Sequence, residues 1–282
     1  MRIALCLYGL VGGLEKWRGK KNAELESSKE ILKIGADFYH KNLIDSNNVD
    51  VFVHSWSKNL EKEIIDLYSP ENSVIENQKK YNIPNHVPGW DWRKHSHYSR
   101  WSSTQIVVDL KRQHEKKNNI KYDFVMLARF DHALEKKIDF STLDSEGVYS
   151  LVWPRWFEKD KPLPDKFYFP LINKIGRERF LKSHSKRLVG YPHNDEGLLD
   201  QWICMNSENM NNFANLYNLL DDYSLPGQCP TDSSGQISAH RQSIYHLQKL
   251  GLEDKISLIL DLHDDYPLIR RKYFFSGVVS GS

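Results

Sequence analysis

An arginine and an aspartate stand two positions apart after an apolar run. Residues 124–128 read Phe-Val-Met-Leu-Ala, and Arg129 and Asp131 follow them. A continuous apolar run bounded by charge is typical of a parallel strand covered on both faces. Ligands of open α/β sheets bind just beyond the carboxyl ends of such strands. The pair therefore predicts a diphosphate site, with Arg129 as a direct partner and Asp131 acting through a divalent metal. The alternative is a surface ion pair that closes the strand.

Glycines follow the first apolar run of the chain. Residues 3–8 predict a buried strand, and Gly9, Gly12 and Gly13 come after it. Glycine lets a backbone approach a ligand closely, so this turn is a candidate ligand contact. The same spacing also makes a plain turn.

The composition indicates a globular α/β protein. The chain has 282 residues, 40% of them apolar, and a net charge of +2. This length predicts one large domain, or one domain with a small lobe. The nearly balanced charge and the lack of a recognised motif argue against nucleic-acid binding. Tryptophan and tyrosine are frequent, and outside a core such rings often line polar grooves, including sugar sites.

The cysteines and the N-terminus bear on the compartment. Cys6, Cys204 and Cys229 are scattered and form no disulfide or metal-binding pattern, which favours a reducing, cytoplasmic location. The apolar stretch 3–14 contains glycines and lacks a clear cleavage site, so we interpret it as a strand and turn rather than a signal peptide. No run reaches the roughly 18 to 20 apolar residues of a membrane helix.

Strands and helices are expected to alternate in the first half of the chain. Strands are predicted over 3–8, 49–54, 74–75, 124–128, 148–152, 167–172, 202–205 and 256–262, and helices over 23–39, 58–68, 99–117, 175–183, 208–220 and 238–250. Residues 77–98 predict a long, functional or mobile loop. This order indicates a single domain, 1–282, with a nucleotide-binding half (1–135) and an acceptor half (136–282).

Four segments together resemble nucleotide-sugar glycosyltransferases of the GT-A type, and in particular WavE-like proteins that build surface glycans. They are the strand and glycine turn at 2–9, the segment 49–56, the helix and strand that end at 126–131, and the block 200–207, Asp-Gln-Trp-Ile-Cys-Met-Asn-Ser. The segment 268–270 also fits. The chain departs from the family in two places. Arg129-Phe130-Asp131 replaces the usual Asp-x-Asp, and in the block 200–207, which is similar to the family pattern Asp-Gln-aromatic-x-x-Gly-Ser, Met205-Asn206 stands in place of the glycine.

The resemblance implies a Rossmann-like, mostly parallel central sheet flanked by helices, and transfer of a sugar from a nucleotide-diphosphate donor to a hydroxyl. Gly9, Gly12 and Gly13 would then form the floor of the nucleotide site. Lys20 would contact phosphate, although a solvated charged segment is the alternative. Arg100 and Ser103 would reach the base or ribose, the alternative being a capped helix start with a solvated arginine.

Three acids are candidates for the base that takes a proton from the acceptor hydroxyl: Asp195, Glu196 and Asp200. Asp200 matches the family pattern and directly precedes a strand, so it is favoured. Asp195 and Glu196 resemble the acidic pair that faces the acceptor in this fold. The alternative for all three is that they complement the dipole of a helix N-terminus.

Asp131 is the expected ligand of Mn²⁺ or Mg²⁺, because hard cations bind carboxylate and phosphate oxygens together. His263 is a second candidate, by analogy with late histidines in some relatives. If no metal binds, Arg129 with Lys20 or Lys21 would carry the charge.

The expected partners are a nucleotide-sugar donor and a glycan or lipid-linked acceptor. Two other functions stay open. One is a nucleotidyltransferase that makes activated sugars, to which segment 9–21 has a loose fit. The other is a non-catalytic glycan-binding module in which tryptophan-rich loops form the binding face.

Overall fold

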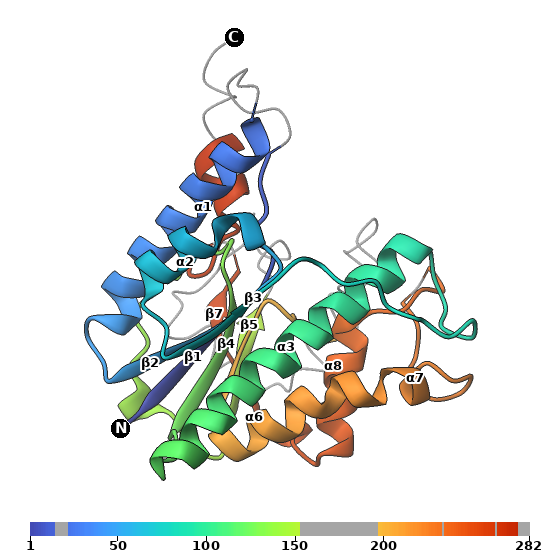
Figure 1. Cartoon of the computed structure of the whole chain (residues 1–282). Coiled ribbons are helices and arrows are strands. Elements are labelled where there is room, and N and C mark those ends of the chain that lie inside the picture. Colours follow the sequence, from blue (N-terminus) through green and yellow to red (C-terminus); the bar gives the residue numbers. More distant parts are fainter. Residues whose placement is uncertain (15–21, 153–196, 233, 263, 276–282) are drawn as a thin grey trace, which may run out of the picture.

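The structure is a computed structural model that describes residues 1–14, 22–152, 197–232, 234–262 and 264–275. Seven strands in these ranges form one sheet, with the order β3-β2-β1-β4-β6-β5-β7 (Figure 1). They are β1 (Ile3–Gly9), β2 (Val49–Ser55), β3 (Asn72–Ile75), β4 (Phe124–Arg129), β5 (Val148–Val152), β6 (Trp202–Met205) and β7 (Ile256–Asp261).

The sheet is parallel except for one strand. β1 pairs in parallel with β2 and with β4, and β2 pairs in parallel with β3. β6 is antiparallel to both β4 and β5, while β7 is parallel to β5. The prediction of an α/β fold with a mostly parallel sheet is therefore confirmed.

Helices connect and cover the strands. The α-helices are α1 (Ala23–Tyr39), α2 (Glu61–Tyr68), α3 (Asp91–Asn118), α6 (Ser207–Ala214), α7 (Leu220–Tyr223) and α8 (Ala239–Lys249). Shorter 3-10 turns are η2 (Lys58–Leu60), η3 (Phe140–Thr142), η6 (Asn215–Leu219) and η7 (Glu253–Lys255), and π turns are η1 (His40–Ile44) and η8 (Arg270–Phe275).

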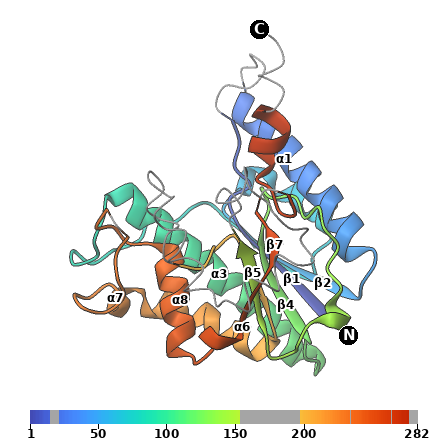
Figure 2. The same cartoon turned by 180° about the vertical axis from the view of Figure 1, so that it is seen from behind.

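Both faces of the sheet are buried, which explains the unbroken apolar runs of its central strands. Leu5 and Leu7 of β1 pack in the cluster that includes α1 and α2. Cys6 and Tyr8 point the opposite way and pack with α3, α6 and α8. Figures 1 and 2 show these two helical layers on either side of the sheet.

Helix α3 is longer than predicted. It begins at Asp91 rather than near Ser99, so residues 91–98 are helical and the expected long loop is shorter. The buried stripe of this first part uses His97 and Trp101, which are four residues apart. Histidine does not register as apolar in a sequence pattern, so the helical period was hidden.

Two other predictions differ from the structure or lie outside it. The helix expected over 208–220 is divided into α6, η6 and α7. The strand at 167–172 and the helix at 175–183 lie outside the described residues. In the part that is described, no helix has both the length and the apolar character needed to cross a membrane.

Candidate functional site

A cavity of about 400 Å³ lies at the carboxyl ends of β1 and β4. β2 and β3 lie on one side of β1 and β4 lies on the other, so the order in which successive strands are added to the sheet reverses at this point. Open α/β sheets bind ligands in the crevice outside such a switch of strand order. We call this space the switch-point cavity; its walls include Tyr8, Gly9, Arg93, Arg100, Arg129, Asp200 and His240.

The reversed direction of β6 brings a distant segment to the cavity. Ala128 near the end of β4 pairs with Trp202 at the start of β6. The residue that precedes β6 therefore lies at the same edge of the sheet as the residue that ends β4. For this reason Asp200 and Arg129 line one cavity although the chain between them is long.

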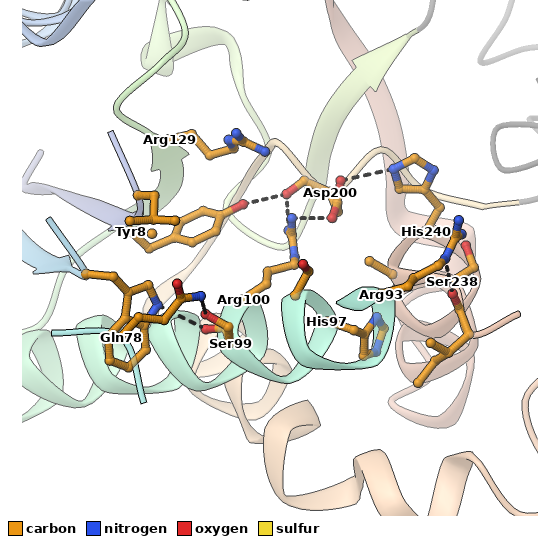
Figure 3. Close-up of a pocket in the computed structure, with 16 residues that line it drawn as sticks. Tyr8, Gln78, Arg93, His97, Ser99, Arg100, Arg129, Asp200, Ser238 and His240 are labelled. Atoms are coloured by element: carbon orange, nitrogen blue, oxygen red, sulfur yellow. Dashed lines mark hydrogen bonds and ion pairs between the residues drawn. The ribbon is translucent and has the colours of Figure 1, made fainter. Parts of the chain in front are cut away.

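Asp200 is at the centre of the polar contacts in this cavity (Figure 3). Its Oδ1 lies 3.0 Å from Nε2 of His240, and its Oδ2 forms an ion pair with Arg100. Its main-chain carbonyl accepts hydrogen bonds from Arg100 and, at 2.8 Å, from the hydroxyl of Tyr8. Side chains from β1, α3 and α8 are thus joined through one residue.

The environment of Asp200 keeps it ionised. Burial by itself raises the pKa of the carboxyl, but the charge of Arg100, the contact with His240 and the charge of Arg129 outweigh it and hold the pKa well below its usual range. Both carboxylate oxygens have partners. Asp200 alone is therefore a weak proton acceptor at neutral pH, and its charge fixes the positions of Arg100 and His240.

Arg100 is held as a rigid donor in the cavity wall. Its guanidinium carbon lies 5.2 Å from the ring centre of Tyr8 and 4.8 Å from that of Trp101, within cation–π range. Its Nε is buried and has no hydrogen-bond partner among the described residues. Arg100 therefore lines the switch-point cavity, and its expected contact with a base or ribose stays a prediction.

Arg129 and Asp131 form a two-pronged ion pair. Nε of Arg129 donates to Oδ1 of Asp131 at 2.8 Å, and Nη2 donates to Oδ2 at 2.7 Å. Burial alone raises the pKa of Asp131, but Arg129 and its other neighbours lower it overall. Asp131 is only 2% exposed, whereas 30% of the Arg129 side chain is exposed, where it lines the cavity. The pair is therefore internal, and Arg129 is the member that lines the cavity.

The three glycines have different roles. Gly9 lines the cavity, but its N–H donates to Ser103 at 2.9 Å and its carbonyl accepts from the Trp56 amide at 3.2 Å. Gly12 has φ +74°, and a Cβ there would lie 4.0 Å from Oδ2 of Asp131. The turn after β1 thus lies against the Arg129–Asp131 pair at Gly12, which is expected if both take part in one binding site.

Gly13 packs against the start of α1. A Cβ at this position would lie 2.4 Å from the carbonyl oxygen of Glu24, so only glycine fits. Gly13 therefore brings the loop close to the helix, which is a packing role, and the structure does not place it in the switch-point cavity.

Ser103 lies beneath the cavity. It is fully buried, and its hydroxyl lies 2.6 Å from Nδ1 of His54 in addition to its bond from Gly9. The expected contact of Ser103 with a ribose is therefore corrected: this side chain joins α3 to β1 and β2. It lies about one helical turn beyond Arg100, on nearly the same face of α3 but deeper beneath the cavity.

The described side chains do not offer a metal site around Asp131. Both of its oxygens accept from Arg129, and the part of the chain that is described has no group of three His, Cys, Asp or Glu residues that could hold a metal ion. The other candidate ligand, His263, lies outside the described residues, as do Lys20, Asp195 and Glu196. We assign no step to a metal.

His240 was not predicted from the sequence. It is the second residue of α8 and packs against Gly197. A Cβ at Gly197 would lie only 2.5 Å from the main chain of His240. The amide of Leu198 also donates to the His240 carbonyl at 3.0 Å. Sequence spacing gives no sign of this contact, because it joins two segments that are distant in the chain.

Arg93 is a second cavity residue that sequence reasoning missed. Its Nη2 lies 2.7 Å from Oδ2 of Asp232, and its Nε donates to the carbonyl of Ile237 at 3.0 Å. These bonds attach the segment before α8 to the first turn of α3. Arg93 therefore supports the wall that carries His240.

Comparison of the chain with models of protein families finds no match, and comparison with curated proteins finds none. The functional argument therefore depends on the geometry of the site.

Proposed function

We propose that this protein is a glycosyltransferase of the GT-A type, which transfers a sugar from a nucleotide-diphosphate donor to a hydroxyl of a glycan or lipid-linked acceptor. The observation that carries the proposal is the meeting of Arg129, Arg100, Asp200 and His240 in one cavity at the switch point of the sheet. That position is where α/β sheets bind nucleotides.

The charge of the cavity suits an anionic donor. Its lining includes three arginines, Arg93, Arg100 and Arg129, and one carboxylate, Asp200. When the sugar leaves, negative charge grows on the diphosphate, and fixed cations stabilise that charge. Arg129 is already oriented by Asp131 through Nε and Nη2, so its remaining amino group is available to a phosphate oxygen without further ordering.

We assign the proton of the acceptor hydroxyl to the Asp200–His240 pair acting as a unit. An imidazole next to a carboxylate is a common general base, because the carboxylate stabilises the charged ring. Asp200 is the positioning member, and Arg100 holds it in place. Asp195 and Glu196 stay as predicted acidic candidates.

A glycan-binding module without catalysis is the second candidate, and one observation favours it. Trp90 and Trp92 are 62% and 63% exposed and lie stacked, with ring centres 5.9 Å apart. Exposed aromatic faces of this kind bind sugar rings. Under the first proposal the same pair receives the acceptor; under the second it is the whole function.

A donor panel separates these functions. UDP, GDP and CMP are titrated into the full chain, and release of sugar from the corresponding donors is followed. We expect one nucleotide to bind, and Arg129→Lys to weaken it by about tenfold, because lysine keeps the charge for Asp131 but loses the planar fork. Arg112→Lys, on the exposed face of α3, is the matched control.

Absence of binding and turnover across the panel contradicts the proposal. Release of pyrophosphate from a nucleoside triphosphate and a sugar phosphate identifies a nucleotidyltransferase instead. Glycan binding without any nucleotide binding supports the module.

A further inference from the structure

A second cavity, also of about 400 Å³, lies on the other side of Arg129. We call it the basic cavity. It is bounded by the loop before β6, the loop after β7 and the turn η8. Its polar lining consists of Arg129, His132, Gln201, Arg270, Arg271 and Lys272, with no carboxylate among the described residues that line it.

Two of these cations have no ion-pair partner among the described residues. Arg270 and Arg271 form no ion pair with any described residue. The positive charge of Arg270 acts on Asp131 and contributes to its lowered pKa, but both oxygens of Asp131 are already bonded to Arg129. Lys272 differs, because its Nζ lies 2.7 Å from Oε2 of Glu135. The uncompensated charge is therefore concentrated on the two arginines that begin η8.

The remaining wall is fixed and polar. His132 is buried; its ring stacks on Tyr266 at 4.6 Å, and its Nδ1 lies 2.9 Å from the Tyr266 carbonyl oxygen. Burial lowers the pKa of His132 to about 4, so the ring is neutral at physiological pH. Gln201 adds a side-chain amide, the only uncharged amide among the described lining residues.

We propose that the basic cavity binds a phosphoryl anion, held by Arg270 and Arg271 together with Arg129 from the shared wall. Planar guanidinium groups match the oxygens of a phosphate in pairs, and an anion removes the mutual repulsion of cations that have no carboxylate beside them among the described lining residues. The cavity has room for such a group, and its wall continues into the switch-point cavity through Arg129.

The source of the anion rests on the proposed function. One source is the diphosphate of the nucleotide sugar, extending past Arg129 from the switch-point cavity. The other is a phosphate of a lipid-linked acceptor. Both present the same oxygens to the same arginines, so the chemistry of the site is the same in the two cases.

Inorganic pyrophosphate is the probe that tests the site. It is titrated calorimetrically into the full chain in metal-free buffer at low ionic strength. We expect Arg270→Gln and Arg271→Gln each to weaken binding about tenfold, since each removes a charge-assisted contact. Arg112→Gln, an exposed arginine on α3, is expected to leave the affinity unchanged.

Thermal unfolding of each variant shows that it is folded; Arg271 is exposed, so its replacement tests the site even if that of Arg270 lowers stability. No detectable binding of pyrophosphate, or equal affinity in the wild type and both variants, overturns the proposal.

Competition then identifies the source. If UDP or GDP displaces pyrophosphate, the donor diphosphate occupies the basic cavity. If both bind together, the site belongs to a separate phosphorylated ligand such as the acceptor. If no nucleotide binds while pyrophosphate still binds through the two arginines, the proposed donor function fails and the anion site stands.

Discussion

Nε2 of His240 lies 3.0 Å from Oδ1 of Asp200, and this contact joins the start of α8 to the segment that precedes β6. The other oxygen of Asp200 is paired with Arg100 of α3. One buried carboxylate therefore orients a cation and an imidazole in the same cavity. Removal of this carboxylate is the sharpest test of how the site is organised.

Asp200→Asn is expected to reduce sugar transfer by about a hundredfold or more, because the neutral amide neither stabilises a charged His240 nor forms an ion pair with Arg100. The variant should also lose about 3 kcal/mol of unfolding free energy, since Arg100 is left as a buried cation without its anionic partner. Initial rates and urea unfolding measure the two effects.

A second variant separates chemistry from stability at this site. Asp200→Asn combined with Arg100→Gln should recover part of the unfolding free energy, because the unpaired cation is gone, while transfer stays low. Asp222→Asn, an exposed acid of α7, should change neither quantity. Full activity in Asp200→Asn would show that the pair has no part in the reaction.

The exposed tryptophan pair is expected to act on the acceptor side. Trp90→Ala and Trp92→Ala should each raise KM for the acceptor by about fivefold to tenfold, since an aromatic face contributes about 1 kcal/mol to a stacked ligand. Affinity for the nucleotide should stay the same. Ile65→Ala, which removes an exposed apolar side chain from α2, is the control. A change in nucleotide affinity rather than acceptor KM contradicts this assignment.

Stability is expected to fall in mildly acidic solution. Burial lowers the pKa of His54, His97 and His132 to about 4, from an ordinary value of 6.5. Below pH 6.5 the unfolded chain binds protons that the folded chain does not. Unfolding free energy is thus constant above pH 6.5 and declines between pH 6.5 and 4, by about 1.4 kcal/mol per pH unit for each histidine.

Urea unfolding across this range measures the slope. His54→Asn should make the slope shallower by the equivalent of one proton, and replacement of the exposed His86 by asparagine should leave it unchanged. The carboxyls of Asp131 and Asp200 titrate in a different window, because their lowered pKa values make their contribution fall only below pH 3.8. A flat profile from pH 7 to 4.5 contradicts the prediction.

A buried lysine stabilises the contact between α3 and α6. Nζ of Lys111 lies 2.9 Å from Glu115, 2.6 Å from Ser207 and 2.8 Å from Asn211. Lys111→Met should lower the unfolding free energy by about 3–5 kcal/mol, because it leaves Glu115 as a buried anion without its cation. Addition of Glu115→Gln should restore part of the loss, and Lys116→Met on the exposed side of α3 should have little effect. Chemical denaturation compares the three.

The strands could be predicted because strands buried on both faces appear in the sequence as continuous apolar runs. The apolar run at 124–128 gives β4, and the charges of Arg129 and Asp131 mark its end. Asp200 was the favoured base because it matches the family pattern and precedes a strand; the structure places it in the switch-point cavity, and its role as a base stays a prediction. For the strand, a local pattern was enough.

The rest depends on contacts between distant segments. The four residues of β6 do not encode their own direction; pairing with β4 and β5 sets it, and this direction brings Asp200 beside Arg129. The contact of His240 with Asp200 arises in the same way. Ser103 was misplaced because the face of α3 that it occupies follows from how the helix packs on the sheet.

Arg129 is part of the wall of both cavities. Its guanidinium cannot give its best geometry to two occupants independently, so the affinities of the two spaces are thermodynamically coupled. Such coupling is reciprocal: the factor by which a molecule on one side alters the dissociation constant on the other applies equally in reverse. Under the two proposals, a single side chain at the end of β4 thus lets the occupancy of each cavity alter the affinity of the other.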